Sequence, residues 1–485
     1  MNKYSLDQCE QEKLHLSGAI QSHGTLLVVN SQNIITHVAK NITDFLPSSS
    51  NCQLSQVLPD PFLALTQPLE KKVGSRTIHS AVIEGKDGVA LDLVISCNTL
   101  LQITLELIPH KPGPYLLSPL IPNTHKFLNS DNSVQEPQDL VQKIYELIKF
   151  DRILYYQFQD QGDGVVTAET ESRTLPGSYL GLRFPASDVP KIARALYLTN
   201  PWRMISDALA NNVEILSHDS TPPDLSFVDL RSVSPIHAAY LTNMGARSSL
   251  SFPIIVGDEL WGLVACHNCQ RYTPSLALLD KISLLVREHT KQLVEHQSKY
   301  RIQLIDGLMR RFMKIQQILS YQNDILTAWP QIGGWLAQEF AIDGAVIGHR
   351  DQFTHWGLGF EPDTLEIVDL WFIENNENIV WCGDFLRNQI PEFPLSQIAG
   401  MLAIKIKLRN GDWFRIYLCR QEYIHEVAWG GNPNKPVEYE SDIGISPRRS
   451  FEKWVEKRFG QSRPWNTESR LLGLKLRELL IQNLQ

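Results

Sequence analysis

Several residues that can hydrogen-bond a ligand fall within one short stretch of this sequence, residues 231–267, namely Arg231, His237, Tyr240, Ser249, Ser251 and His267. A short helix is predicted at its start, because Ser234 can cap a helix and Pro235 suits the first helical position. On that helix His237 and Tyr240 are three residues apart and therefore share a face. Imidazole and phenol groups on one face can donate and accept hydrogen bonds to a common ligand.

Two strand-like runs follow, SSLSFPII and LWGLVACH. Alternation along a strand places Ser249 and Ser251 on one face and Leu250 and Phe252 on the other. His267 ends the second run. Polar groups at the edges of apolar elements favour a ligand pocket. The alternative, favoured for any one of these residues alone, is a hydrogen-bonded polar residue of an ordinary core.

Length and charge narrow the class of protein. A chain of 485 residues should form about three domains. The net charge of −8 argues against nucleic-acid binding, because no basic surplus can neutralise phosphates. We see no signal peptide and no apolar run long enough for a membrane span. The seven scattered cysteines indicate reduced thiols, so we expect a cytoplasmic protein.

Hydrophobic patterning predicts strands in three regions and one very long helix. The helix should run from near Ser275 to about Gln322, which at 1.5 Å per residue is about 65 Å, longer than one domain needs. It could join two domains and offer a face to a second copy. The predicted strands are LLVVN, IITHVA, HSAVIE, ALDLVIS, LQITLELI, the hairpin DRILYYQFQ and GVVTAET, and later GAVIG, IVWCG, AGMLAIKIKL and DWFRIYLCR.

Three parts of the chain resemble segments of bacterial-type phytochromes. The run RSVSPIHAAYLTNMGARSSLSFPIIVGDELWGLVACHN resembles their chromophore-binding GAF domain. The run HLSGAIQSHG, which follows Cys9, resembles the segment that leads into their PAS domain, with Ser17 and Ser22 where the family usually has prolines. The runs WGGNP and SPRRSFEKW resemble the two ends of the tongue, a long hairpin of their PHY domain.

The resemblance implies an α+β fold of three domains, each a central antiparallel sheet with flanking helices, joined by a long helical spine. It places a PAS domain with the chromophore-attachment segment at 1–121, a GAF domain at 134–297 and a PHY domain at 298–485, with the tongue at about 425–465. It also implies a figure-of-eight knot between PAS and GAF, which patterning alone would not suggest because knots are rare.

The resemblance also implies a cofactor. Bacterial-type phytochromes attach biliverdin IXα as a thioether to a cysteine at the place of Cys9, although the local sequence does not mark this thiol as reactive. Plant and most cyanobacterial members use a cysteine in the GAF helix, where this chain has Ala238. The single matching thiol therefore points to biliverdin, not phycocyanobilin.

Further site residues follow from matching positions. Arg203 and Arg231 would hold the two propionates, with help from Ser249 and Ser251, because a guanidinium fork suits carboxylates. The implied cofactor-binding residues are Cys9, Tyr156, Phe184, Asp188, Tyr197, Arg203, Arg231, His237, Tyr240, Ser249, Ser251 and His267. Without the resemblance, the aromatic members of this set would more often be plain core.

The implied function is red and far-red light sensing by Z/E isomerisation of the pigment. Asp188 would contact Arg448 of the tongue in one photostate, and Ser450 and Trp429 would share the signalling role. We expect a parallel homodimer. The family's output modules, a histidine kinase or a diguanylate cyclase, would begin where this chain stops, so the chain itself is not expected to be an enzyme.

Two other readings stay open. Cys266 and Cys269 form a C-x-x-C pair around His267, which could bind metal or act in redox chemistry, but no second pair stands at zinc-site spacing. The phosphate-binding, dinucleotide-binding, zinc-protease and serine-hydrolase motifs are not found. The other alternative is a non-photochemical small-molecule sensor on the same scaffold, because folds do not fix ligands.

Overall fold

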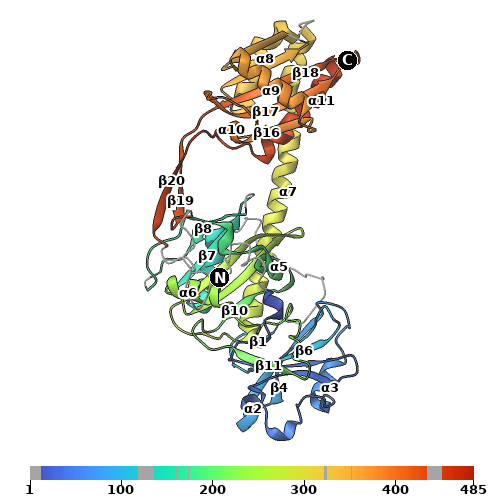
Figure 1. The fold of residues 1–485 in the computed structure, drawn as a ribbon, viewed down its shortest axis with the longest axis vertical. Coiled ribbons are helices and arrows are strands. Elements are labelled where there is room, and N and C mark those ends of the chain that lie inside the picture. Colours follow the sequence, from blue (N-terminus) through green and yellow to red (C-terminus); the bar gives the residue numbers. More distant parts are fainter. Residues whose placement is uncertain are drawn as a thin grey trace, which may run out of the picture. The chain divides into compact units, whose positions relative to one another are not determined.

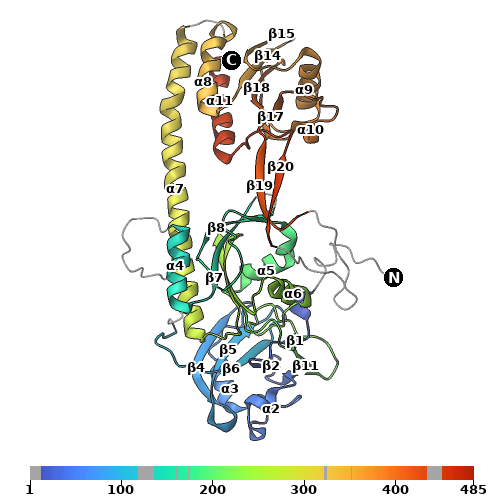
Figure 2. The same ribbon diagram turned by 90° about the vertical axis from the view of Figure 1, so that its left-hand side faces the viewer.

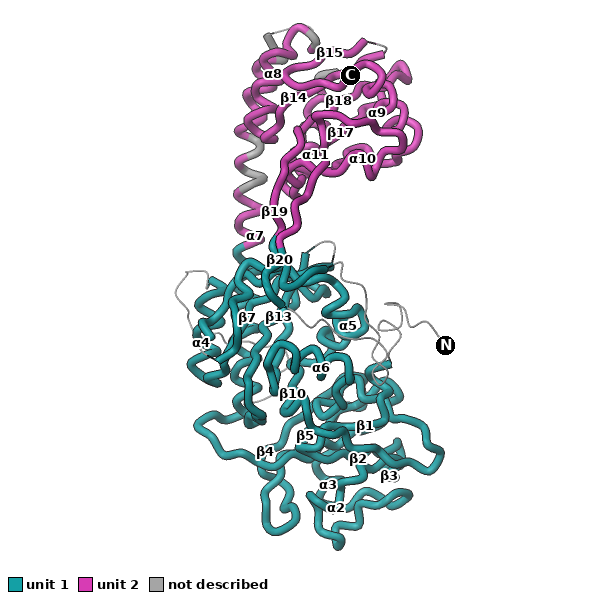
Figure 3. The backbone as a smooth tube through the Cα atoms, turned by 60° about the vertical axis from the view of Figure 1, so that its left-hand side comes forward, with its two compact units in different colours: residues 1–296, 428–454 teal, residues 297–427, 455–485 magenta. Residues whose placement is uncertain are grey.

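The computed structural model describes residues 13–117, 136–159, 162–172, 174–321, 325–350, 352–433 and 451–484. The chain divides into two compact units, teal and magenta in Figure 3. The first comprises Met1–His296 and Ala428–Trp454, and the second Gln297–Val427 and Val455–Gln485.

The first unit contains two sheets (Figure 1). One has the strand order β1-β11-β3-β2-β6-β5-β4. Its strands are β1 (Ala19–Ile20), β2 (Thr25–Val29), β3 (Ile35–Ala39), β4 (Arg76–Glu84), β5 (Ala90–Cys97), β6 (Ile103–Pro109) and β11 (Val213–Ser217). The predicted strands of this region are confirmed. Short helices accompany them: η1 (Leu14–Leu16), α2 (Ile42–Phe45), η2 (Ser48–Ser50), α3 (Asp60–Thr66) and η3 (Lys86–Gly88).

The N-terminal segment of the first unit lies among residues that come about two hundred positions later. Strand β1 pairs with β11, and Ile20 forms a bridge with Arg231. The side chain of Gln21 donates to the carbonyl of Met204 at 2.8 Å. These contacts are those that the predicted figure-of-eight crossing requires. Because β11 belongs to this sheet, the sheet includes a strand that local patterning did not assign to it.

The second sheet has the order β10-β12-β13-β7-β8-β9-β19-β20. Its strands are β7 (Arg152–Phe158), β8 (Gly164–Glu169), β9 (Arg183–Phe184), β10 (Arg203–Ile205), β12 (Ser248–Val256), β13 (Glu259–Asn268), β19 (His425–Gly430) and β20 (Lys453–Arg458). The predicted β7–β8 hairpin is confirmed. One pairing in this otherwise antiparallel sheet is parallel, between Trp429 of β19 and Arg183 of β9.

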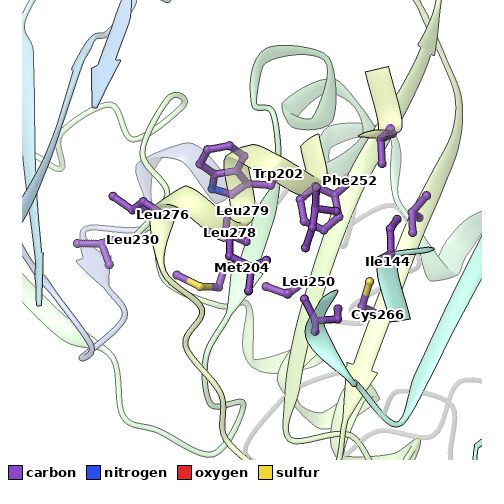
Figure 4. Packing of buried hydrophobic residues seen from close by; sticks show 14 of the residues in the cluster. Ile144, Trp202, Met204, Leu230, Leu250, Phe252, Cys266, Leu276, Leu278 and Leu279 are labelled. Carbon is purple, nitrogen blue, oxygen red and sulfur yellow. The ribbon is translucent and has the colours of Figure 1, made fainter. Parts of the chain in front are cut away.

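Helices cover one face of this second sheet. Helix α4 (Pro137–Ile148) lies beside the first turns of α7 (Leu276–Tyr321) in Figure 2, and both contribute to one buried cluster. Figure 4 shows part of this cluster, in which Leu250 and Phe252 of β12 pack near Leu279 of α7. The other helices of the unit are η4 (Ala186–Asp188), α5 (Lys191–Thr199) and α6 (Pro235–Asn243). The predicted long helix is confirmed, since α7 has 46 residues.

The second unit is built on a sheet in the order β15-β14-β18-β17-β16. Its strands are β14 (Gly344–His349), β15 (Gln352–Gly357), β16 (Val380–Gly383), β17 (Ile398–Lys407) and β18 (Trp413–Gln421). One face packs with α8 (Ile325–Phe340), α11 (Thr467–Leu484) and the end of α7, and the other with α9 (Pro362–Glu374) and α10 (Leu386–Gln389). The predicted strands of this region are confirmed.

The core behind the second sheet should dominate the stability of the first unit. Leu279 is fully buried, so Leu279→Ala should lower the free energy of unfolding by about 2–5 kcal/mol through lost transfer energy and a cavity. Leu198 of α5 is 43% exposed, so Leu198→Ala should change it by less than about 0.5 kcal/mol. Equilibrium urea unfolding compares the two, and equal losses would contradict this assignment of the core.

Candidate functional site

The face of the second sheet that points away from α4 and α7 carries five of the predicted site residues. In the ladder, Arg203 pairs with Ser251, Ser249 pairs with His267, and Leu263 pairs with Tyr156. Directly paired residues of antiparallel strands share a face, as do residues two apart on one strand. All five polar residues therefore lie on one face, opposite the apolar residues of β12 that fill the core in Figure 4.

Two arginines on this side, Arg231 buried and Arg203 half-buried, are held by carbonyl groups. Arg203 donates to the carbonyls of Asp229 and Ser232, at 3.2 and 2.8 Å. Arg231 donates to the carbonyl of Leu225 at 3.3 Å. In the described part of the chain, neither guanidinium forms an ion pair with a carboxylate. Burial lowers the pKa of Arg231 to about 9, and the charge of Arg203 contributes to the fall.

The carboxylate of Asp229, whose charge acts on both arginines, already has other partners. Its two oxygens accept from both terminal nitrogens of Arg76, and one also accepts from the indole of Trp202 at 3.0 Å. The arginine pair therefore retains positive charge that Asp229 offsets only in part, with Arg231 buried and Arg203 half-buried. An anionic ligand with carboxylates would satisfy it, because charge-assisted bonds are strongest where water is excluded.

Helix α6 supplies a second group of side chains. His237 and Tyr240 lie one turn apart, and their rings stack with centroids 6.0 Å apart and an interplanar angle of 11°. The hydroxyl of Tyr240 donates to a carboxylate oxygen of Asp188 at 3.0 Å. Asp188 ends η4, just before Pro190 caps α5.

Both site histidines are neutral at ordinary pH. Desolvation by the surrounding protein lowers the pKa of His237 to about 4, with a smaller contribution from Arg203. Burial lowers the pKa of His267 to about 3, with Arg152 and His237 adding to the effect. Nδ1 of His267 is buried and has no hydrogen-bond partner among the described residues. A neutral imidazole with an unused nitrogen can donate to or accept from a ligand.

Aromatic rings surround this polar group. The ring of Tyr156 lies 5.2 Å from that of Phe158 and 6.2 Å from that of Phe184. A side chain at Gly164 would collide with Tyr156, since a Cβ there would lie 2.0 Å from the ring. Burial raises the pKa of Tyr197, while the Ser251 hydroxyl and the charges of Arg203 and Arg231 oppose that rise, so Tyr197 belongs to the same group.

The two ends of the tongue reach this group within the first unit. Trp429 is buried and pairs with Arg183. Phe451 contacts Tyr240 edge to face, with centroids 5.1 Å apart, and Tyr179 at 6.2 Å. The structure thus brings together the predicted site residues that it describes. Cys9, Arg448 and Ser450 lie outside the described residues.

Sequence reasoning did not predict a group of buried side chains that supports the site. Arg152 is fully buried, forms an ion pair with Glu169 at 3.0 Å, and lies 4.1 Å from the ring of Tyr179. Glu169 also accepts from the amide of Tyr179 at 2.8 Å. Together they fix the ring against which Phe451 packs. No sequence signal identifies this set, because a lone arginine in a strand is usually surface-exposed.

The C-x-x-C pair does not form a metal site in the described part of the chain. Cys266 is buried in β13, and burial raises the pKa of its thiol. Cys269 lies beyond the strand, and its amide donates to Asp151 at 2.8 Å. No group of three or more His, Cys, Asp or Glu side chains suited to a metal ion occurs among the described residues.

None of the described helices is long and apolar enough to cross a membrane.

Comparison with known families matches three domains in order. The PAS fold model matches residues 9–106, the GAF domain model residues 138–286, and the phytochrome region model residues 314–485. Domains of these types in this order define a multidomain sensory module. The precise boundaries given above (1–121, 134–297 and 298–485) stay predictions.

Individual relatives agree with these matches. The chain is 28% identical to cyanobacterial phytochrome B of Nostoc sp. and 28% identical to the bacteriophytochrome of Pseudomonas aeruginosa, in each case over 98% of this chain. It spans 66% of the length of each of these two relatives. The solved photosensory core module of the Stigmatella aurantiaca phytochrome superposes with a TM-score of 0.79 and 26% identity, covering 99% of both chains. The chain belongs to the phytochrome family and has the PAS–GAF–PHY organisation of its photosensory core.

The depressed histidine pKa predicts a loss of stability in acid. An unfolded histidine titrates near 6.5, whereas His267 in the folded protein titrates near 3, so the unfolded state binds more protons between these values. Stability should therefore fall as pH falls below 6.5, and His267 should account for about 1–2 kcal/mol of the loss between pH 6.5 and pH 5. Urea unfolding of pigment-free protein at both pH values measures it. His267→Asn should show a smaller difference, and an unchanged difference would refute the assignment.

Proposed function

We propose that this chain is the light-sensing part of a red/far-red photoreceptor, in which biliverdin IXα binds on the face of the second sheet and is attached to Cys9. One observation carries the proposal: two desolvated arginines, with no carboxylate partner among the described residues, lie beside a neutral histidine and a group of aromatic rings. A bilin offers complementary groups, namely two propionates, polar pyrrole and carbonyl groups, and flat apolar rings.

Each residue then has a role that its surroundings support. Arg203 and Arg231 would bind the propionates, with Ser249 and Ser251 donating further bonds. His267 has an unused buried nitrogen that could bond the carbonyl of ring D, and His237 would lie near the pyrrole nitrogens. The rings packed around the isomerising ring would be those of Tyr156, Phe184, Tyr197 and Tyr240. The main-chain oxygen of Asp188 would accept from the pyrrole N–H groups.

When bound, the pigment supplies light absorption and Z/E isomerisation of the bridge between rings C and D. The protein converts this into a change at the tongue. Tyr240 is hydrogen-bonded to Asp188 and packs on Phe451. A change of partner at Tyr240 or Asp188 would therefore alter the surface on which the tongue packs. Arg448, three residues before Phe451, would exchange with Asp188 in one photostate. Such a contact has two discrete arrangements and can act as a switch.

The wider context follows from the same proposal. The chain would act as a parallel homodimer in the cytoplasm and would pass its signal to a histidine-kinase or cyclase module of a longer protein. The chain itself would carry no enzyme activity. A non-photochemical sensor with the same domains would bind a small molecule without a light-dependent spectrum, and the first experiment below separates the two.

Incubation with biliverdin should give a red-absorbing complex whose spectrum changes reversibly on illumination. Arg231→Ala should weaken biliverdin binding about 10- to 150-fold, because one charge-assisted bond contributes about 1.5–3 kcal/mol. Arg247→Ala should leave affinity unchanged, since Arg247 pairs with Asp207 in an exposed position. Fluorescence quenching measures affinity. A colourless protein, or a bound pigment that does not respond to light, would exclude the photoreceptor function.

Attachment through Cys9 is tested by denaturation. Cys9→Ser should still bind biliverdin, because the noncovalent contacts remain, but the pigment should be lost on a denaturing gel stained with zinc. Cys269→Ser should retain it. Pigment that survives denaturation in the Cys9→Ser protein would place the thioether elsewhere.

The tongue's role is tested with Arg448→Ala. This variant should attach biliverdin normally, because Arg448 is not among the binding residues, but should form less photoproduct or lose it faster in darkness. Light-minus-dark absorption spectra and dark reversion rates measure both. Photoconversion identical to that of the unmodified chain would contradict the assigned role.

A further inference from the structure

Strand β7 presents two consecutive tyrosines to opposite sides of the second sheet. Tyr156 faces the site and packs against Phe158 and Phe184. Tyr155 faces the helices and belongs to the core cluster that includes Leu279 and Ile282 of α7. Because neighbouring residues of a strand alternate faces, a displacement of the backbone at Tyr156 also displaces Tyr155.

Tyr155 forms a polar contact with the long helix inside this apolar core. Its hydroxyl oxygen lies 2.8 Å from Nε2 of His289, which is on α7. The two side chains are 0% and 2% exposed, and their rings meet edge to face with centroids 5.3 Å apart. Trp261 packs edge to face on the same tyrosine at 6.0 Å.

This bond is directional, whereas the contacts around it are not. Separation of this buried hydroxyl from the buried imidazole would cost the energy of the hydrogen bond in addition to that of the lost packing. The bond therefore fixes α7 to β7 at one height and one rotation. Helix α7 continues without a break from Leu276 to Tyr321, so a rotation imposed near His289 extends along its length.

We propose that the Tyr155–His289 hydrogen bond is a positioning contact that carries a change at the pigment through β7 into α7, separately from the tongue. The inference rests on the proposed light-sensing function. The two routes leave the site on opposite faces of the sheet: Phe451 packs on Tyr240 on the site face, whereas Tyr155 and His289 lie in the core behind it. The light signal would thus reach α7 directly, as well as through the tongue.

The test compares amide hydrogen exchange in light and darkness for α7 residues 284–300 in the biliverdin-loaded chain. Tyr155→Phe removes only the hydroxyl, and the light-minus-dark difference should fall at least twofold while the absorption spectrum and photoproduct yield stay unchanged. His289→Leu should do the same, and the double variant should lose no more than either single variant. His289→Gln, whose amide can still bond the hydroxyl, should restore part of the difference.

Thr290→Val is the matched control, because it removes a buried hydroxyl from the next residue of the same helix. That hydroxyl donates within α7, to the carbonyl of Val286, and does not reach β7. The light-dependent exchange should therefore be retained in this variant.

The possible outcomes distinguish a failure of this inference from a failure of the proposed light-sensing function. If the unmodified chain binds biliverdin but does not photoconvert, the proposed function fails, and the inference fails with it. If every variant photoconverts and Tyr155→Phe keeps the full light-dependent exchange of α7, only the inference is overturned. A Tyr155→Phe protein that no longer photoconverts would place Tyr155 in the pigment site and would also overturn it.

Discussion

The candidate site depends on the desolvation of two guanidinium groups, those of Arg203 and Arg231. Neither group is paired with a carboxylate in the described part of the chain. A guanidinium cannot release its proton under ordinary conditions, so it must be solvated by protein dipoles or by a ligand. Here carbonyl groups of residues 225–232 provide part of that solvation. The N-terminal segment helps to position this backbone, since Gln21 bonds the carbonyls of Met204 and Arg231. Under the proposed function the chain crossing therefore supports the binding site, because it positions the backbone that holds the arginines.

The second sheet separates two tasks by the alternation of its strands. One face is apolar and packs on α4 and α7, which gives the unit its stability. The other carries polar residues whose burial is costly, and the proposed ligand would offset that cost. This division explains why so much of the site could be predicted: strand alternation alone assigns Ser249 and Ser251 to one face and Leu250 and Phe252 to the other.

The sequence could not predict the contacts that join distant segments. Nothing local indicates that β11 leaves its neighbours to pair with β3, that Arg152 lies buried against Glu169, or that Phe451 packs on Tyr240. Such pairings depend on which elements meet, and patterning describes each element by itself. The choice of site residues needed the family resemblance, because single histidines, arginines and aromatics are usually structural. For Cys9 the resemblance remains the only argument.

The proposed pigment site would have to be stiff and switchable at once, and the structure meets these two demands with different bonds. The Arg152–Glu169 ion pair is buried, so it fixes the position of the Tyr179 ring. The Tyr240 hydroxyl and the Asp188 carboxylate are joined by a hydrogen bond of 3.0 Å, and both side chains are only partly buried. Exchange of one such bond costs little compared with breaking a buried ion pair. If one ring of a bound ligand turned, the partners of Tyr240 would therefore change before the ring of Tyr179 was disturbed. Phe451 of the predicted tongue contacts the rings of both Tyr179 and Tyr240, so its packing would change with that exchange.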